Sequence, residues 1–452
     1  MIPATHGHPR FQSYVLPELQ PAAATCHAQV IPYWTSQTLL LDLARPLTRL
    51  LHLRGAVNLL AVGLICCVIA SAAIACLVVA VRAGVAVRVA AAAVTWLIVA
   101  DSAYFDYFAS PLGEGTGVLG ILLVCAGIPL LGRGLRTGLP GLVLVGSGGM
   151  LAVGAKTQLL VLAAPIVLVL LLRTVALGRT RGRLVKRLAP RSLGAVAAVC
   201  VIAVAGLSYR SHKTYDTYVR MNPVDTIFSG IVDGRHDTRA DLAFLGLPPQ
   251  WAKYAGTNWW TNNQAFSRDP FYRRYESKLT LTNTCRFWVT HPGRTVAVLQ
   301  ARAQQLLGMR PTYLGSYMPS AHLPPGAQEH RLELVSSAAR SVRTAGLFLL
   351  VPAWTVTAWC GVRCLRRGRR PGGRHLDRSL GTVVLFLEVC AVSQFVMAAL
   401  GEAMENEKHM VFAAFCTLML CPVLLVAAAR NSRAAQAPLL LRRAIARRHT
   451  HG

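Results

Sequence analysis

Nine long apolar runs, separated by polar segments, divide the chain. A helix that crosses a bilayer needs about 20 mostly apolar residues, so each run predicts a transmembrane helix. The expected fold class is an all-α polytopic membrane protein with about nine transmembrane helices. The runs 139–155 and 158–172 are short and closely joined. The alternative that they form a single re-entrant element therefore stays open. The nine runs are 57–81, 85–100, 117–132, 139–155, 158–172, 192–208, 344–363, 379–400 and 411–429.

Basic residues gather in four of the polar segments, 132–138, 173–191, 366–378 and 430–452. These segments alternate with the apolar runs so that all four fall on one side of the membrane. The positive-inside rule makes that side cytoplasmic, including the C-terminus. The formal net charge of +28, in a chain that is 54% hydrophobic and 15% charged, is then mainly a topology signal. The expected partners of these loops are anionic lipids and not nucleic acid.

The order of apolar and polar segments predicts five regions. Leucines along one side of 38–55, beside three arginines, favour a helix lying in the outer interface over a span. Apolar spacing after residue 270 predicts two amphipathic helices broken at His291–Pro292. The regions are an extracytoplasmic segment 1–56 containing the interfacial helix, about six spans in 57–208, a mainly helical extracytoplasmic domain 209–343, the last three spans in 344–429, and a basic cytoplasmic tail 430–452.

The segment "ADSAYFDYFASPLGEG" (100–115) places three carboxylates where two spans meet the outer surface. A general base must reach the proton that it removes, and a carboxylate can serve this purpose. Asp101 is the first candidate, and Asp106 and Glu114 are the next. The alternative is an acidic connecting loop without chemistry.

Three cationic or titratable side chains lie at outer ends of spans. Lys156 ends one run, and Lys408 and His409 precede the last one. Cations on a leaving phosphate stabilise the charge that develops there, so these residues are candidates for binding a donor phosphate. For Lys156, contact with a lipid headgroup is the alternative. Glu388 lies in the middle of a run, where it either hydrogen-bonds to another span or belongs to a site.

Aromatic residues and cysteines add two expectations about the outer surface. Trp259, Trp260 and Tyr107 are candidates for stacking on sugar rings, although tryptophans at the membrane interface belt would look the same. Cys26 and Cys285 are the two cysteines in outer segments. They are either unpaired or joined by a disulfide. No metal site and no cofactor are predicted, and a need for a divalent metal stays open.

Four motifs in this order resemble the actinobacterial multi-pass glycan hexosyltransferases of the GT-C type. They are "DSAYFDYFASPLGEG", "AKTQ", "HPGRTVAVLQARAQQLLGMRPTYLGSY" and "ENEKHMVF", and the resemblance covers residues 34–430. It implies transfer of a sugar from a polyprenyl-phosphate donor to a cell-envelope glycan acceptor on the outer face of the membrane. One departure is Ala109, where the family would have a polar Asn before Ser110.

Two other functions are compatible with the same pattern. One is a transporter or flippase of lipid-linked glycan, which the intramembrane Glu388 would suit; no internal repeat typical of many transporters is visible. The other is a non-catalytic protein of envelope assembly. The hexose, the acceptor and the stereochemistry cannot be read from the residues.

The N-terminal segment raises a separate expectation. Nine crossings place residue 56 outside, yet 1–37 contains no apolar core long enough for a signal peptide. The resembling enzymes begin with a span and an outer loop, so this chain is expected to lack its family's first transmembrane span. A re-entrant element at 139–172 would instead leave the N-terminus inside.

Overall fold

The computed structural model is helical throughout its described part and contains no β-strand there. That part is residues 34–449 apart from 82, 133, 174–182, 215, 260, 262–264, 313, 316, 318–320, 325, 372–374 and 404. Residues 1–33, which include Cys26 and the expected remnant of an outer loop, lie outside it. Whether Cys26 and Cys285 are unpaired or joined by a disulfide is therefore a question that also falls outside the described residues.

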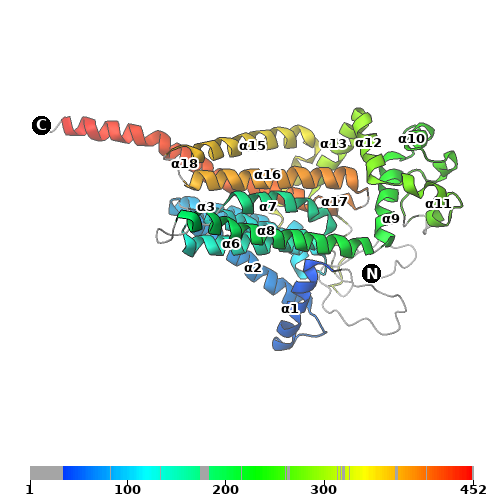
Figure 1. Ribbon diagram of the computed structural model, residues 1–452, viewed down its shortest axis with the longest axis horizontal. Helices are drawn as coiled ribbons and strands as arrows, with labels where there is room; N and C mark the ends of the chain where they lie inside the picture. Colours follow the sequence, from blue (N-terminus) through cyan, green and yellow to red (C-terminus); the bar gives the residue numbers. More distant parts are fainter. Residues whose placement is uncertain are drawn as a thin grey trace.

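Nine helical segments run side by side in an elongated bundle (Figure 1). We call the two ends of the bundle the domain end, where the residues between α8 and α15 lie, and the tail end, where α18 leaves the bundle (Figure 1). The segments are α2 (Leu59–Ala80), α3 (Val85–Ala100), α5 (Gly113–Gly127), α6 (Leu135–Ala155), η3 (Thr157–Leu162) with α7 (Ala163–Leu172), α8 (Arg183–Thr214), α15 (Leu347–Arg369), α16 (His375–Gly401) and α18 (Val411–His449). The 3-10 turn η2 (Ile128–Leu130) follows α5.

Seven described helices are long and apolar enough to cross a membrane, and an eighth span arises if α3 is joined to the bent segment after it. That segment consists of α4 (Ser102–Phe105) and η1 (Asp106–Ala109), and the bend is 57°. These findings confirm an all-α polytopic membrane protein. The lipid-facing sides of the outer helices are apolar, as a hydrocarbon environment requires; on α2 they expose Leu60, Leu64 and Val68.

The shortest apolar segment, Thr157–Leu172, extends between both ends of the bundle. Lys156 before it contacts groups at the domain end, whereas Arg173 after it donates from Nη2 to Ser379 Oγ at 2.7 Å, near the start of α16 at the tail end. Its first six residues are a 3-10 helix, which rises about 2.0 Å per residue instead of 1.5 Å. This stretches 16 residues to about 27 Å, close to the thickness of a hydrocarbon core. A re-entrant turn does not fit this course.

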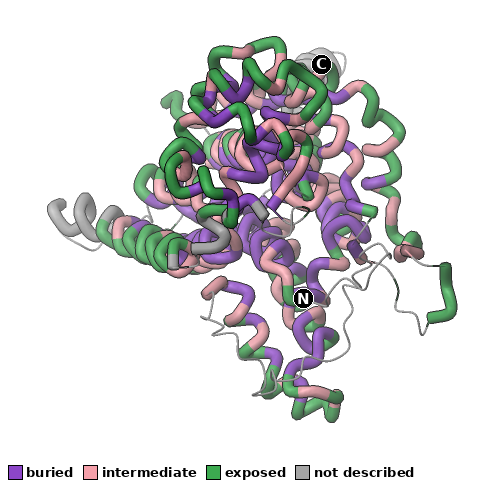
Figure 2. Tube along the Cα trace, turned by 90° about the vertical axis from the view of Figure 1, so that its right-hand side faces the viewer, coloured by how far each residue is buried: buried purple, intermediate pink, exposed green. Residues whose placement is uncertain are grey.

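Helix α5 is the centre of the bundle. Its residues from Glu114 to Gly127 are all buried, whereas α2, α8 and α15 expose much of their surface. Figure 2 shows buried residues gathered toward the inside of the molecule and exposed residues toward its outside. The glycines of α5 explain its close fit, because they recur every seven residues and meet small residues of α6. A Cβ on Gly120 would lie 2.6 Å from Gly148 O, and a Cβ on Gly127 would lie 2.7 Å from Gly141 O. Backbone therefore packs directly on backbone, as small residues permit in membrane helices.

The residues between α8 and α15 form a helical domain with its own core. Phe266 lies between Phe228 and Trp251, with ring centroids 4.8 and 4.6 Å away. The predicted break at His291–Pro292 is where α12 ends and α13 begins. The elements are α9 (Asp216–Asp225), the π-helix η4 (Thr226–Ile231), α10 (Thr238–Leu245), η5 (Pro249–Tyr254), η6 (Ala265–Arg268), α11 (Tyr272–Tyr275), η7 (Glu276–Lys278), α12 (Leu281–Thr290), α13 (Pro292–Gly308), α14 (Leu334–Ser341) and η9 (Arg343–Ala345).

Helix α1 (Ser36–Leu50) projects sideways at the domain end (Figure 1). Leu40 and Ala44 on one side are buried, while Leu39 and Leu43 on the other side are exposed. The helix ends five residues before the end of the predicted interfacial segment 38–55. Its two apolar sides suit a helix that packs on the bundle and also lies against lipid.

Candidate functional site

Glu114 and Lys156 meet because α5 and α6 pack without side chains between them. A Cβ on Gly113 would clash with Ala155 O, so the start of α5 touches the end of α6. The next residue on each helix is the charged one. Lys156 Nζ donates to Glu114 Oε1 at 2.9 Å, and the Glu114 side chain is only 3% exposed. The glycines repeated every seven residues in α5 thus place a partly buried ion pair at the domain end.

The loop between α16 and α18 adds four more charged or titratable groups to this pair. Lys156 Nζ lies 2.8 Å from His409 Nδ1, and Lys408 Nζ lies 2.5 Å from Glu405 Oε2. The short helix α17 (Asn406–His409) presents Lys408 and His409 in its last turn. We name this group the charged cluster: Glu114, Lys156, Glu402, Glu405, Lys408 and His409.

His409 Nδ1 faces an ammonium and a carboxylate at the same time. Besides Lys156, it lies 2.6 Å from Glu402 Oε2. Burial lowers the pKa of His409, and the neighbouring lysines lower it further, against the opposite effect of Glu402. In a neutral ring, Nδ1 either accepts a hydrogen bond from Lys156 or donates one to Glu402, but cannot do both. Burial alone would raise the pKa of Glu402, but His409 and the two lysines hold it at about 2.

With a neutral His409, the charged cluster carries three carboxylates and two ammonium groups. All of its members come from the domain ends of α5, α6, α16 and α17 or from the loop between them. Gln158, on η3, fixes the loop by donating from Nε2 to His409 O at 2.9 Å. Glu114 is buried, the other members are partly exposed, and each lysine already contacts a carboxylate, so an anion that enters must exchange partners with the carboxylates already present.

Asp101 makes its hydrogen bonds to backbone. Its Oδ1 accepts from Ala103 N at 3.1 Å, and its Oδ2 accepts from Val335 N at 3.0 Å and Ser336 N at 2.9 Å. One side chain therefore caps both α4 and α14. Asp101 is 2% exposed and holds the loop 101–112 against the segment before α14.

Asp106 belongs to a second charged group, centred on Arg310. Arg310 Nη2 lies 2.5 Å from Asp106 Oδ2, and its Nη1 lies 3.0 Å from Glu333 Oε1. Glu333 also binds Arg340, at 2.7 Å. The buried guanidinium thus ties η1 to the chain between α13 and α14, and within the described part of the chain no hydrogen bond or ion pair joins Asp106 to the charged cluster.

The remaining predicted residues lie in different surroundings. Tyr107 and Trp259 are buried, and Trp259 N donates to Asp225 Oδ1 at 2.6 Å within the domain core. Trp260 lies outside the described residues. Glu388 Oε2 accepts from Thr357 Oγ1 of α15 at 2.6 Å, which is the hydrogen bond to another span that its position suggested.

Two residues with close polar contacts at the domain end, Glu402 and Gln37, carried no signal in the sequence. Glu402 was one of several acids in its loop, and its contact with His409 depends on how α17 turns. Gln37, in the first turn of α1, donates from Nε2 to Ser110 O at 2.8 Å and accepts from Thr116 Oγ1. Contacts between polar residues this far apart in sequence could have been predicted only from co-variation between homologues.

No group of three or more His, Cys, Asp or Glu side chains in the described part of the chain is arranged to hold a metal ion. A long helical bundle with an apolar exterior, a helical domain at one end and a partly buried charged cluster beneath that domain defines a polytopic membrane protein. The chain belongs to the family of the YfdI N-terminal transmembrane domain, whose model matches residues 5–441. Neither a curated protein nor a solved structure matches the sequence.

Proposed function

We propose that this chain is an integral membrane glycosyltransferase that moves a sugar from a polyprenyl-phosphate donor to a cell-envelope glycan acceptor. The family is one of GT-C-like membrane glycosyltransferases. The observation that carries the proposal is the convergence of Glu114, Lys156 and His409 from three separate parts of the chain. A carboxylate beside cations at a membrane surface provides the two kinds of group that such a transfer needs.

The orientation belongs to the proposal. The described residues of all four basic segments lie at the tail end, so the positive-inside rule places the tail end and the C-terminus in the cytoplasm. The domain and the charged cluster are then outside the cell membrane. Nucleotide sugars are not normally available there, so a lipid-carried donor is required.

Lys156, Lys408 and His409 are proposed to bind the donor phosphate. In the free protein both lysines contact carboxylates, at 2.9 Å for Lys156 and 2.5 Å for Lys408. A phosphate would draw these ammonium groups away through charge-assisted hydrogen bonds. The carboxylate of Glu114 would then lose its partner and become available to accept a proton.

Transfer forms a bond between an acceptor hydroxyl oxygen and the anomeric carbon and breaks the bond from that carbon to the phosphate. The phosphate leaves with the electron pair, and a carboxylate takes the hydroxyl proton. We place Glu114 first as this base because it adjoins the proposed phosphate site. Asp106 and Asp101 follow, since the first is held by Arg310 and the second caps two helices. Tyr107, Trp259 and Trp260 stay predictions as sugar contacts.

The test is transfer by purified protein in liposomes supplied with a panel of labelled polyprenyl-phosphate sugars and a cell-envelope glycan acceptor. Glu114→Gln should abolish transfer with no loss of thermal stability large enough to explain it. Glu407→Gln is the matched control, because it makes the same change in the loop that carries Lys408 and has no assigned role. Movement of the donor across the bilayer without transfer would instead identify a flippase. If the protein shows neither activity, the non-catalytic assembly protein is the remaining interpretation.

A further inference from the structure

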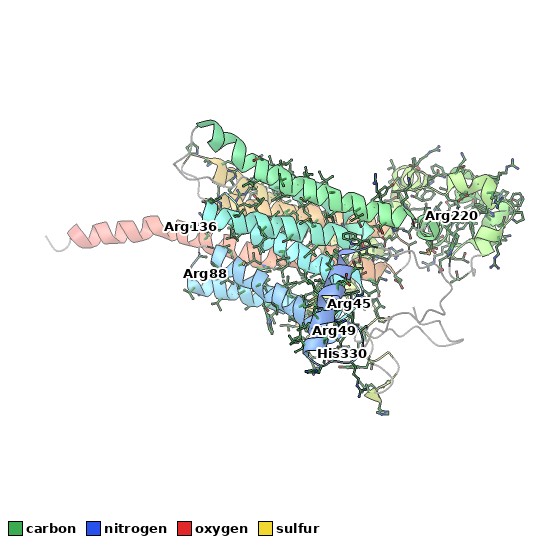
Figure 3. The ribbon with its side chains drawn as sticks, turned by 60° about the horizontal axis from the view of Figure 1, so that its bottom comes forward. Arg45, Arg49, Arg88, Arg136, Arg220 and His330 are labelled. Atoms are coloured by element: carbon green, nitrogen blue, oxygen red, sulfur yellow. The ribbon has the colours of Figure 1, made fainter. Side chains whose placement is uncertain are left out.

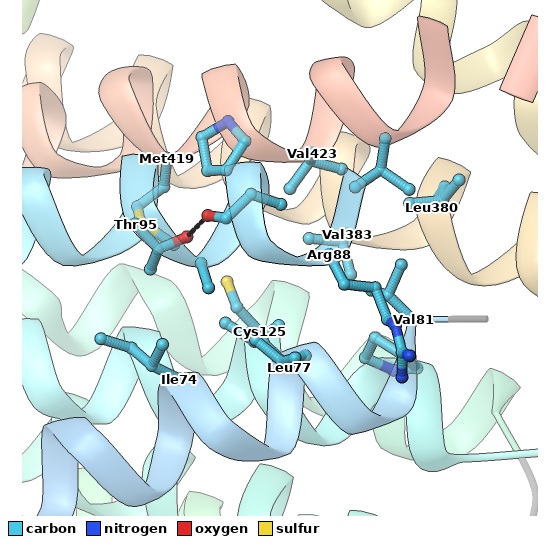
Figure 4. A pocket seen from close by; sticks show the side chains of 16 residues that line it. Ile74, Leu77, Val81, Arg88, Thr95, Cys125, Leu380, Val383, Met419 and Val423 are labelled. Atoms are coloured by element: carbon cyan, nitrogen blue, oxygen red, sulfur yellow. Dashed lines mark hydrogen bonds between the residues drawn. The ribbon is translucent and has the colours of Figure 1, made fainter. Parts of the chain in front are cut away.

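A largely apolar pocket lies in the tail half of the bundle, away from the charged cluster (Figure 4). It lies between α2, α3, α5, α16 and α18 and is partly open to the outside; the empty space within it and at its mouth is about 550 Å³. The lining residues extend from Ile74 to Val81 on α2 and from Arg88 to Thr95 on α3. At about 1.5 Å per residue, each stretch covers about 10 Å along its helix, so the pocket follows the helix axes for about two turns.

Arg88 is the one charged residue among those that line the pocket. It lies one turn from the start of α3 and therefore at the tail end of the pocket (Figure 4). Its Nε is buried, and no described group accepts a hydrogen bond from it. A buried donor without an acceptor is unusual in proteins, which indicates that the guanidinium is suited to an anion that enters from outside the chain.

We propose that this pocket binds one anionic phospholipid of the leaflet at the tail end, with an acyl chain in the apolar part and the phosphate on Arg88. An acyl chain matches walls made of leucine, isoleucine, valine, alanine and methionine side chains. A phosphate oxygen would satisfy the guanidinium through a charge-assisted hydrogen bond. The surrounding basic loops raise the local concentration of anionic lipid.

The place of the pocket separates this lipid from the sugar donor of the proposed function. The proposed phosphate site lies at the domain end, beside Lys156, whereas Arg88 lies at the tail end. The two sites therefore take phosphates of opposite leaflets. This inference does not depend on glycosyl transfer and holds for a transporter or an assembly protein as well.

The experiment uses the full chain in nanodiscs of phosphatidylcholine that contain phosphatidylglycerol with a photoreactive group on its acyl chain. Crosslinks should map to α2, α3 and α18. Arg88→Gln should weaken phosphatidylglycerol binding about tenfold or more, as the loss of a hydrogen bond between charged groups implies. Arg136→Gln is the matched control, because Arg136 is an exposed arginine at the same end of the bundle and does not line the pocket (Figure 3).

Two further variants keep the test decisive. Ala92→Phe should reduce crosslinking by filling the pocket while Arg88 is retained, and Arg88→Lys should restore part of the binding. Equal labelling of wild type and Arg88→Gln would mean that Arg88 only reaches the interface and would overturn the proposal. Equal labelling by a phosphatidylcholine probe would also overturn the proposal. Displacement of phosphatidylglycerol by polyprenyl phosphate would overturn it too, because it would mean that the pocket binds the polyprenyl chain of the sugar donor.

Discussion

Gly120→Ala tests whether backbone contact between α5 and α6 is what positions the charged cluster. The added Cβ would lie 2.6 Å from both Ala152 N and Gly148 O. This is about 0.8 Å short of the 3.4 Å at which ordinary contact begins. Both obstructing atoms are backbone, so no side chain can rotate away, and the helices must separate.

The magnitude follows from two opposing effects. Overpacking of this kind costs about 3 kcal/mol at the upper end of its usual range, and the better helix propensity of alanine returns about 1 kcal/mol. We expect a net loss of about 2 kcal/mol in the free energy of unfolding. Separation of the helices should also lengthen the Glu114–Lys156 contact and reduce transfer in the protein that remains folded.

The assay combines thermal unfolding in detergent with transfer in liposomes. Gly206→Ala is the matched control, since Gly206 lies in the apolar helix α8 and nothing stands within 4 Å of its added Cβ. This control should unfold at the same temperature as wild type or above it. If Gly120→Ala and Gly206→Ala have equal stability and equal activity, the account of the α5–α6 contact is wrong.

Three other predictions concern single side chains. Asp101→Asn weakens the caps of two helices and should lower the unfolding temperature while transfer per folded molecule persists; unchanged stability with lost transfer would make Asp101 the base. The pKa of His409 lies below its usual 6.5, and a bound phosphate should raise it. Donor binding should therefore take up a proton and tighten as pH falls from about 8 to 6, in a titration that His409→Gln should flatten. Burial raises the pKa of Asp225 to about 6, because it disfavours the charged carboxylate. The free energy of unfolding should therefore decrease as pH rises through 6. Asp225→Asn should remove this decrease and add up to about 3 kcal/mol to the free energy of unfolding at pH 7.

The apolar pattern predicted the helices well because hydrocarbon leaves the backbone little choice. Each of the nine runs corresponds to a helical segment, and the break at His291–Pro292 was visible from proline alone. Length was harder to judge. The run 158–172 looked too short for a confident span, because its 3-10 beginning, which stretches it, has no clear sequence signal.

The charged cluster was only partly predictable. Glu114, Lys156, Lys408 and His409 all stood at ends of spans, so topology alone placed them on one side. Which of them touch depends on the rotation and packing of the helices. The recurrence of glycine every seventh residue in α5 was a usable signal for close packing, but it names neither the partner helix nor the register that pairs Glu114 with Lys156.

Charge is handled differently at the two ends of the bundle, and this difference links the proposed function to the lipid site. At the domain end, carboxylates stand beside the cations, so an arriving phosphate must compete for Lys156 and Lys408. At the tail end, acids are scarce, and Arg173 donates its hydrogen bonds to Leu131 O and Ser379 Oγ instead. Asp377 there already binds Arg430, at 2.9 Å. The tail end consequently keeps a positive charge that the chain does not neutralise, and Arg88 needs an acceptor from the membrane.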